Sequence, residues 1–287
     1  MSITAFVPEI WTANLLTALR KTLVYAGPQV VNRDYEGEIS RAGDTVRITS
    51  IGDPTIVDYN QGDTLNYEDL QDAGQALLID QQKAFAFKVD DIDRAQAAGT
   101  VMPEAMSRAA YRLADTADQF IASLYTAVQS ANQVAAGAAV TTTTASDDFY
   151  NKVLVPLKVK LDEADVPTVG RYVVVPSWGH GLLLQSKLFV DASQSADPTT
   201  LRNGYVGRAA GFDVLMSNNV PNPSGSDYVV TAGTNSAISY ADQIVDTEPL
   251  RLQSSFSDAV RGLHVYGAKV VRPDSIASAL VTRPAGI

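Results

Sequence analysis

The spacing of hydrophobic residues along the chain predicts both helices and strands. Apolar residues recur at three- and four-residue steps over residues 8–24 and again over 103–130, the period of a helix with one apolar face. Residues 41–51 and 84–89 instead alternate apolar and polar positions, the period of a strand. The helix over 103–130 would be roughly 40 Å long, more than twice the usual globular length. Its single narrow stripe predicts a spine laid along a flat sheet.

The stretch between the two predicted strands is acidic. It has no Lys or Arg between Ile48 and Gln82. Its carboxylates are Asp53, Asp58, Asp63, Glu68, Asp69, Asp72 and Asp80. We interpret the strands and the excursion between them as one extended hairpin, with a flexible surface loop as the alternative. Because an isolated two-stranded hairpin is marginal in water, we expect this hairpin to lie on another surface.

From residue 146 onward the pattern becomes mixed α/β. Ser146 or Asp147 begins a helix whose apolar positions are Phe149, Val153, Leu157 and Leu161. Pro156 should kink this helix, because proline removes one backbone hydrogen bond and crowds the preceding turn. Ser177 is expected to be the N-cap of a shorter helix that runs to Leu184.

Apolar runs in the C-terminal half predict several strands and one long final strand. They lie at 171–176, 212–217, 228–232, 237–241 and 259–273, the last ending at Pro273. The order is helix, hairpin, long helix, α/β block and final strand. We therefore expect two lobes that share a sheet, because one β region is interrupted by a compact α/β insert.

Composition narrows the class of protein. The chain has 287 residues, 46% of them hydrophobic, no cysteine and a formal net charge of −10. A strongly acidic chain should not bind a nucleic-acid backbone, because a protein's affinity for phosphates comes mostly from its Lys and Arg side chains. Without cysteine there are no disulfides and no thiolate chemistry. The N-terminal residues lack the features of a signal peptide, and no apolar run approaches the length of a membrane span.

The sequence carries no recognisable set of catalytic residues. The two histidines, His180 and His264, have no second metal ligand at a suitable spacing. Ser177 lies three residues before His180, but a nucleophile elbow needs glycine two residues on either side of the serine, and Val175 and Gly179 occupy those positions. We expect no catalytic residue, cofactor or metal, with a serine hydrolase using Ser177 and His180 as the enzymatic alternative. His264 is interpreted as a packing or interface residue.

Several short segments carry a family resemblance in their order. They are DDIDRA (90–95), LRNGYVG (201–207), AGFDV (210–214), SNNVP (217–221) and VRGLHVYGAKVVRP (260–273). Together with the hairpin and the long helix, they resemble the major capsid proteins of tailed bacteriophages, especially the branch without a cleaved N-terminal scaffold segment.

The resemblance implies an α+β chain with the HK-ninety-seven-type capsid fold. Its implied parts are an N-arm with the amphipathic helix (1–40), an extended E-loop hairpin (41–90), a P-domain with the spine helix (91–146), an α/β A-domain (147–245), and a P-domain return strand with the C-terminus (246–287).

The resemblance also implies the function. Such a protein self-assembles through pentamers and hexamers into the icosahedral shell that encloses a tailed phage's double-stranded DNA, without binding a particular DNA sequence or a membrane. It would be assembled in the host cytoplasm and end in the virion, with portal, scaffolding and decoration proteins as further partners. An encapsulin-like nanocompartment shell is the alternative.

Two groups of residues are candidates for contacts between subunits. On the acidic hairpin they are Asp63, Glu68, Asp69 and Asp72, and on the helices they are Arg108, Arg112 and Trp11. We expect the hairpin carboxylates of one subunit to pair with the two arginines of the next.

A family feature is expected to be missing. Some members join their subunits covalently through an isopeptide bond from an E-loop lysine to an asparagine. The hairpin has no lysine between Ile48 and Gln82, so this route is closed unless Lys83 serves. The sequence therefore predicts a shell held together without covalent bonds.

Overall fold

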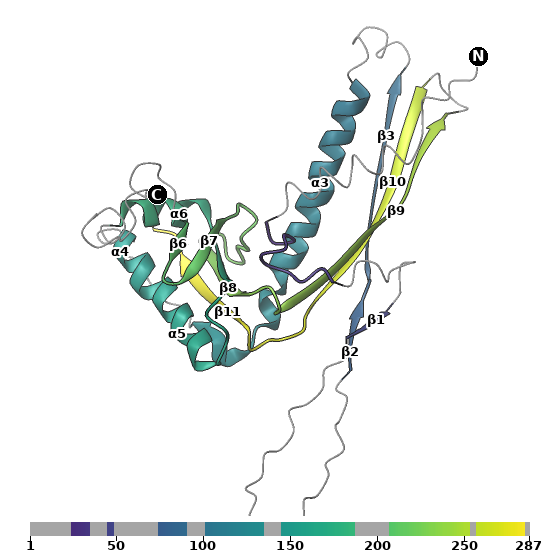
Figure 1. Cartoon of the computed structure of the whole chain (residues 1–287). Helices are drawn as coiled ribbons and strands as arrows, with labels where there is room; N and C mark the ends of the chain where they lie inside the picture. The colour runs from purple at the N-terminus through teal and green to yellow at the C-terminus, as the bar shows by residue number, and fades with distance from the viewer. Residues whose placement is uncertain are drawn as a thin grey trace, which may run out of the picture.

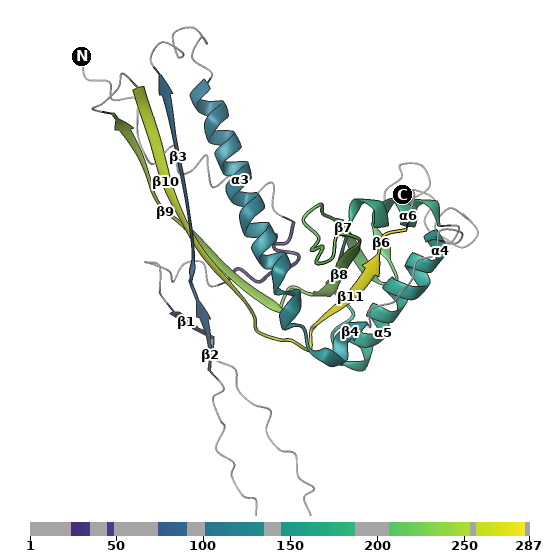
Figure 2. The same cartoon turned by 180° about the vertical axis from the view of Figure 1, so that it is seen from behind.

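The computed structural model describes residues 24–34, 45–48, 74–90, 101–134, 145–186, 207–252 and 257–284. It places a compact α/β lobe beside an elongated arm, in which a long helix runs along a long, narrow sheet (Figures 1 and 2). The two lobes expected from the sequence are present, but each has its own sheet.

The sheet of the compact lobe is mixed and has six strands in the order β4-β11-β8-β5-β7-β6. The strands are β4 (Gln133–Val134), β5 (Arg171–Val175), β6 (Arg208–Ala209), β7 (Phe212–Met216), β8 (Asp227–Thr234) and β11 (Ile276–Thr282). Every residue of the central β5 is buried. That burial explains its continuous apolar run, because both faces of the strand are covered.

A helical layer covers one face of this sheet. The first helical stretch consists of α4 (Ala145–Phe149), the π-helical turn η4 (Tyr150–Leu154) and α5 (Val155–Glu163). Its apolar positions predicted from the sequence are all fully buried in one core with β5, β8 and β11. The regular α-helical hydrogen bonding is interrupted at η4, which ends two residues before Pro156, a residue without a backbone N–H.

The second helix of this layer is α6 (Ser177–Gln185). The prediction that Ser177 caps it is wrong. Pro176 is the N-cap residue, and no side chain caps the helix, so Ser177 lies one position later, in the first turn.

The sheet of the arm is antiparallel and has the order β3-β10-β9. Its strands are β3 (Gln81–Asp90), β9 (Ile238–Arg251) and β10 (Ser257–Val270). Helix α3 (Val101–Ser123) lies along it and contacts β3 and β10 (Figure 1). Its buried residues are Met106, Ala110, Leu113, Ala114, Ala117, Asp118, Ile121 and Ala122. The prediction of a spine helix along a sheet is confirmed.

The helix is shorter than its apolar pattern predicts. It begins at Val101 and ends at Ser123, and the chain then tightens into the 3₁₀ turns η2 (Leu124–Ala127) and η3 (Ser130–Asn132). Val128 is buried, as expected, but its backbone is extended. The N–H of Gln129 bonds to the carbonyl of Pro273. This hydrogen bond, to a residue far along the chain, takes the place of the one that a continued helix would make.

Strand pairing corrects the hairpin prediction. Strand β1 (Thr45–Ile48) pairs with β2 (Gln75–Leu78), whereas the strand over 84–89 belongs to β3 and pairs with β10. Alternation reports a half-buried strand but not its partner.

Two further strand predictions differ from the structure. The strand expected at 237–241 continues to Arg251. The final predicted strand ends at Val270, and a further strand that the sequence pattern did not predict, β11, follows it. Pro249 is tolerated within β9 because β9 is an edge strand of its sheet.

The base of the hairpin lies on the outer face of the arm sheet. Ile48, Leu77 and Ile79 form a buried cluster with Ala241 and Val265. The approach is close at Gly267 of β10, where a Cβ atom would overlap the carbonyl oxygen of Leu78 and lie 3.0 Å from the Cα atom of Ile79. Glycine at this position therefore allows the backbone of the hairpin to lie directly on the strand.

We predict that Gly267→Ala displaces the hairpin base and lowers stability by about 1–3 kcal/mol, because the added methyl group meets backbone atoms. Urea unfolding measures the loss, and amide exchange at residues 75–79 locates it. Gly74→Ala is the matched control, since no atom lies within 4 Å of its added Cβ. Equal stability of the two variants would contradict the close-packing account.

Candidate assembly surfaces

The exposed face of α3 is basic and aromatic. Arg108, Tyr111 and Arg112 are exposed there, on the side opposite the buried stripe. Spacings of three and four residues place the three side chains next to one another. The side chain of Arg112 is 81% exposed and lies 4.0 Å from the carboxylate of Asp115, one turn along the same helix. This face can accept carboxylates from outside the chain.

Both arginines were predicted from the sequence, but Tyr111 was not. Tyr111 is 57% exposed, and its position between the two arginines makes it a candidate contact residue. The signal for it in the sequence was an aromatic residue interrupting the polar face of a long helix. The other predicted contact residues, Asp63, Glu68, Asp69, Asp72 and Trp11, lie outside the described residues.

The outer face of the arm sheet is the second exposed surface. Beyond the hairpin base it has a shallow hollow of about 230 Å³, lined by Ala84, Glu248, Arg261, Gly262 and Leu263. Arg261 forms an ion pair with Glu248 across the two strands. Small and apolar side chains beside a paired arginine offer contact area with little unpaired charge.

A buried carboxylate joins three parts of the molecule. Asp118 of α3 is 3% exposed. Its Oδ1 accepts hydrogen bonds from the N–H groups of Val24 at 3.0 Å, Tyr25 at 2.6 Å and Ala26 at 3.4 Å. Its Oδ2 accepts one from the side-chain amide of Asn219, in the loop between β7 and β8, at 3.0 Å. Asp118 thus ties the N-terminal segment and the compact lobe to the spine helix.

The N-terminal segment is also tied to the arm sheet. Asn32 exchanges backbone hydrogen bonds with Ile238 and Tyr240. Arg33 forms an ion pair with Asp242 at 2.9 Å, and His264 lies 3.4 Å from the same carboxylate. Burial alone would raise the pKa of Asp242, but the hydrogen bond from His264 and the charge of Arg33 outweigh it and hold that pKa below its ordinary value. The carboxylate therefore stays charged between its partners.

His264 itself is 1% exposed, in ring contact with Tyr266. Its interpretation as a packing residue is confirmed.

Nothing in the described part of the chain forms a hydrolase site. Ser177 and His180 lie on the same short helix, and no hydrogen bond joins them there. A hollow of about 130 Å³ beside Ser177 has no histidine and no carboxylate among its lining residues. Burial lowers the pKa of His180, which is only partly enclosed.

The described residues also contain no group of three or more His, Cys, Asp or Glu side chains placed to hold a metal ion. None of the described helices is long and apolar enough to cross a membrane.

Comparison with known proteins identifies the family. Residues 72–279 match the model of a family described as phage capsid protein. No curated protein matches the chain. A solved structure from Mycobacterium phage Che8 is 38% identical in sequence, with a TM-score of 0.73 over 90% of each chain.

More distant structures share the fold. The capsid of the cyanophage P-SCSP1u has 17% identity and a TM-score of 0.66, covering 85% of each chain. A virus-like particle from Pyrococcus furiosus has 13% identity and a TM-score of 0.57, covering 95% of this chain and 98% of the other.

Fold, exposed surfaces and matches define a structural protein that assembles with copies of itself. The chain belongs to the phage capsid protein family. It is a major capsid protein that forms the phage shell, with the HK-ninety-seven-type fold, and its place is the capsid of the virion. The family resemblance seen in the sequence is confirmed.

We predict that Asp118→Ala lowers the free energy of unfolding by about 3 kcal/mol, because three backbone N–H groups and one amide lose a charged acceptor. Thermal or urea unfolding measures the loss, and amide exchange should rise at residues 24–26. Asp115→Asn is the control, since Asp115 also contacts Asn219, at 2.9 Å, but bonds none of those N–H groups. If amide exchange at residues 24–26 were unchanged in Asp118→Ala, Asp118 would not be what anchors the N-terminal segment.

Proposed function

We propose that the subunits build their shell as pentamers and hexamers, with the acidic hairpin of one subunit lying on the exposed face of α3 of the next. The observation that carries this proposal is the group of Arg108, Tyr111 and Arg112, which gives the spine helix an exposed surface that is basic and aromatic. The chain's own residues 49–73 carry carboxylates and no Lys or Arg, which is the complementary charge.

The energy of such a contact favours assembly over a tight dimer. An exposed ion pair contributes only about 0–1 kcal/mol. Burial of a tyrosine ring adds apolar area, and a closed shell sums many weak contacts. Weak pairwise contacts also allow errors in assembly to reverse before the shell closes.

The two lobes fit different places in a ring of subunits. We assign the six-stranded lobe to the axial A-domain, and α3 with the three-stranded sheet to the peripheral P-domain. The boundary expected at residue 245 lies inside β9, which runs unbroken from Ile238 to Arg251. We therefore move the proposed boundary to the change of sheet between β8 and β9, and assign β11 to the A-domain.

The hairpin base and the N-terminal segment are assigned in the same way. Strands β1 and β2 form the base of the E-loop, and residues 24–34 are the anchored end of the N-arm. The anchoring by Asp118 and Asp242 supports this, because an arm that reaches a neighbour needs a fixed origin.

The proposal also covers what the shell encloses and which other proteins it binds. We assign double-stranded DNA as the content, held without sequence-specific contacts, which suits a net charge of −10. Portal and scaffolding proteins, and decoration proteins on the outside, are the further proposed partners, with assembly in the host cytoplasm. The nanocompartment alternative has no specific support, because a likeness at 13% identity shows the fold alone.

The purified protein is expected to form uniform shells or capsomers in negative-stain microscopy. After boiling in denaturant, the particles should run as a single band of the 30.6 kDa chain. That result follows from the absence of lysine between residues 48 and 82. A ladder of covalent oligomers would show that the subunits are joined chemically, with Lys83 as the first residue to test.

We predict that reversing Arg108 and Arg112 to Glu blocks or slows assembly while leaving the subunit folded, because the face then repels the hairpin. The reversal of Asp63, Glu68 and Asp69 to Lys should have the same effect. Particle yield by sedimentation and microscopy measures assembly, and circular dichroism checks the fold.

The combined variant, with both sides reversed, is the decisive control. Complementary charges are then restored, so particle yield should recover relative to either reversal alone. A normal particle yield from the triple hairpin variant would contradict the proposed pairing. So would a combined variant whose particle yield does not recover.

A further inference from the structure

The loop between α5 and β5 is fixed by its own backbone. Helix α5 ends at Glu163, and Asp165 adopts a left-handed conformation with φ of 54°. The N–H of Asp165 bonds to the carbonyl of Asp162, and that of Val166 to the carbonyl of Leu161. These are the two hydrogen bonds of a Schellman motif, and Val166 and Leu161 supply its buried apolar contact.

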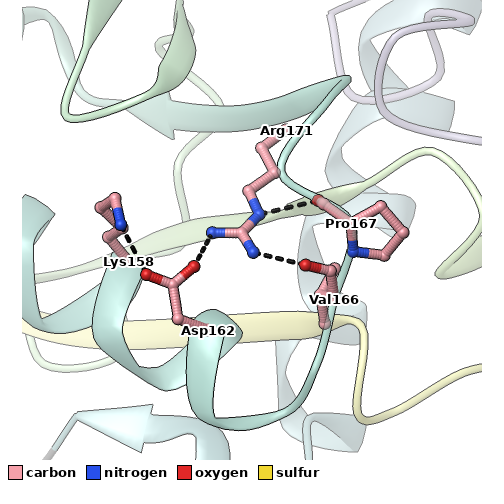
Figure 3. A network of polar contacts seen from close by, with 5 residues as sticks. All are labelled: Lys158, Asp162, Val166, Pro167 and Arg171. Carbon is pink, nitrogen blue, oxygen red and sulfur yellow. Dashed lines mark hydrogen bonds and ion pairs between the residues drawn. The ribbon is translucent and has the colours of Figure 1, made fainter.

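A buried guanidinium holds the same loop from the other side. The side chain of Arg171, at the start of β5, is 3% exposed. It donates hydrogen bonds to Asp162 at 2.6 Å, to the carbonyl of Val166 at 2.5 Å and to the carbonyl of Pro167 at 2.9 Å (Figure 3). Lys158 binds the second carboxylate oxygen of Asp162 at 2.5 Å. The hydrogen bonds from Lys158 and Arg171 lower the pKa of Asp162, so the network stays charged near neutral pH.

The tip that this network holds is exposed and carries one large apolar side chain. Residues 167–170 are all exposed, and Val169 is 82% exposed, more than any other large hydrophobic residue among those described. Pro167 restricts the backbone at one side, and Gly170, with φ of 75°, makes the turn into β5 at the other. At 82% exposure, the Val169 side chain buries little apolar surface within its own chain. A loop that is already held in one shape loses little conformational entropy when a surface covers it.

We infer that Val169 at the tip of the α5–β5 loop is a contact point with a second copy of this chain in the assembled shell. The inference deepens the proposed function and depends on it. The occupant is a copy of the chain because the protein belongs to a family that assembles from its own copies. Arg171 acts as a positioning residue, which keeps the tip in one shape before the partner arrives. Burying one valine side chain is worth about a tenfold change in an association constant.

The natural absence of cysteine makes a direct test available. In Val169→Cys, the single thiol should react rapidly with a maleimide in unassembled subunits and at least about tenfold more slowly in intact shells, since the contact excludes the reagent. Dissolving the labelled shells in denaturant and labelling again counts the protected thiols.

Substitution gives the second measurement. Val169→Asp should raise the protein concentration needed for assembly by about tenfold or more, without changing the thermal midpoint of the subunit. Val169→Ile should assemble normally, because it keeps the apolar contact, and Thr168→Ser is the matched control within the tip. Arg171→Met should weaken assembly and speed amide exchange in residues 164–170.

The outcomes separate this inference from the proposed function. If the unaltered protein forms no shells, the proposed function fails. If it forms shells, but the thiol at position 169 reacts equally in shells and subunits, or Val169→Asp assembles at the ordinary concentration, the inference alone is overturned.

Discussion

The burial of one carboxylate in the spine helix is the constraint on which the rest of the architecture depends. Asp118 is placed where three backbone N–H groups and one side-chain amide converge, so the N-terminal segment, α3 and the compact lobe are fixed against one another. A buried charge is tolerated only when its hydrogen bonds are satisfied. The surrounding core, with Tyr25, Ile121 and Tyr172, draws on the same three parts, and it excludes water from the carboxylate.

The arm depends on a second constraint, which is the close approach of backbones. Gly267 lets the base of the hairpin lie directly on β10, and the opposite face of the same sheet carries α3 and the Arg33–Asp242 pair. A narrow three-stranded sheet would otherwise expose both faces. In the described part of the chain, the hairpin base packs on one face of this sheet and α3 runs along it (Figure 2).

These features explain how a capsid subunit can work without catalytic chemistry. Its function requires rigid parts that present fixed surfaces, and its charged networks serve that purpose. Arg171 shapes a loop, Asp242 anchors a segment, and Arg108 and Arg112 offer charge at the surface. Ser177 and His180, the pair that suggested an enzyme, lie on one turn of α6, and no hydrogen bond joins their side chains in the described structure.

The sequence by itself determined the element types, the spine helix and the family, since helical and strand periods follow from which faces are buried. It also indicated Arg108 and Arg112, whose exposure follows from lying opposite the apolar stripe. Only the tertiary structure decided that β3 pairs with β10, that α3 stops at Ser123, and that β11 returns to the compact lobe. Only the tertiary structure showed that Val169 is exposed and that Asp118 is buried. Periodicity records how a residue faces its neighbours in the chain, whereas strand partners and buried charges are set by contacts between segments far apart in the sequence.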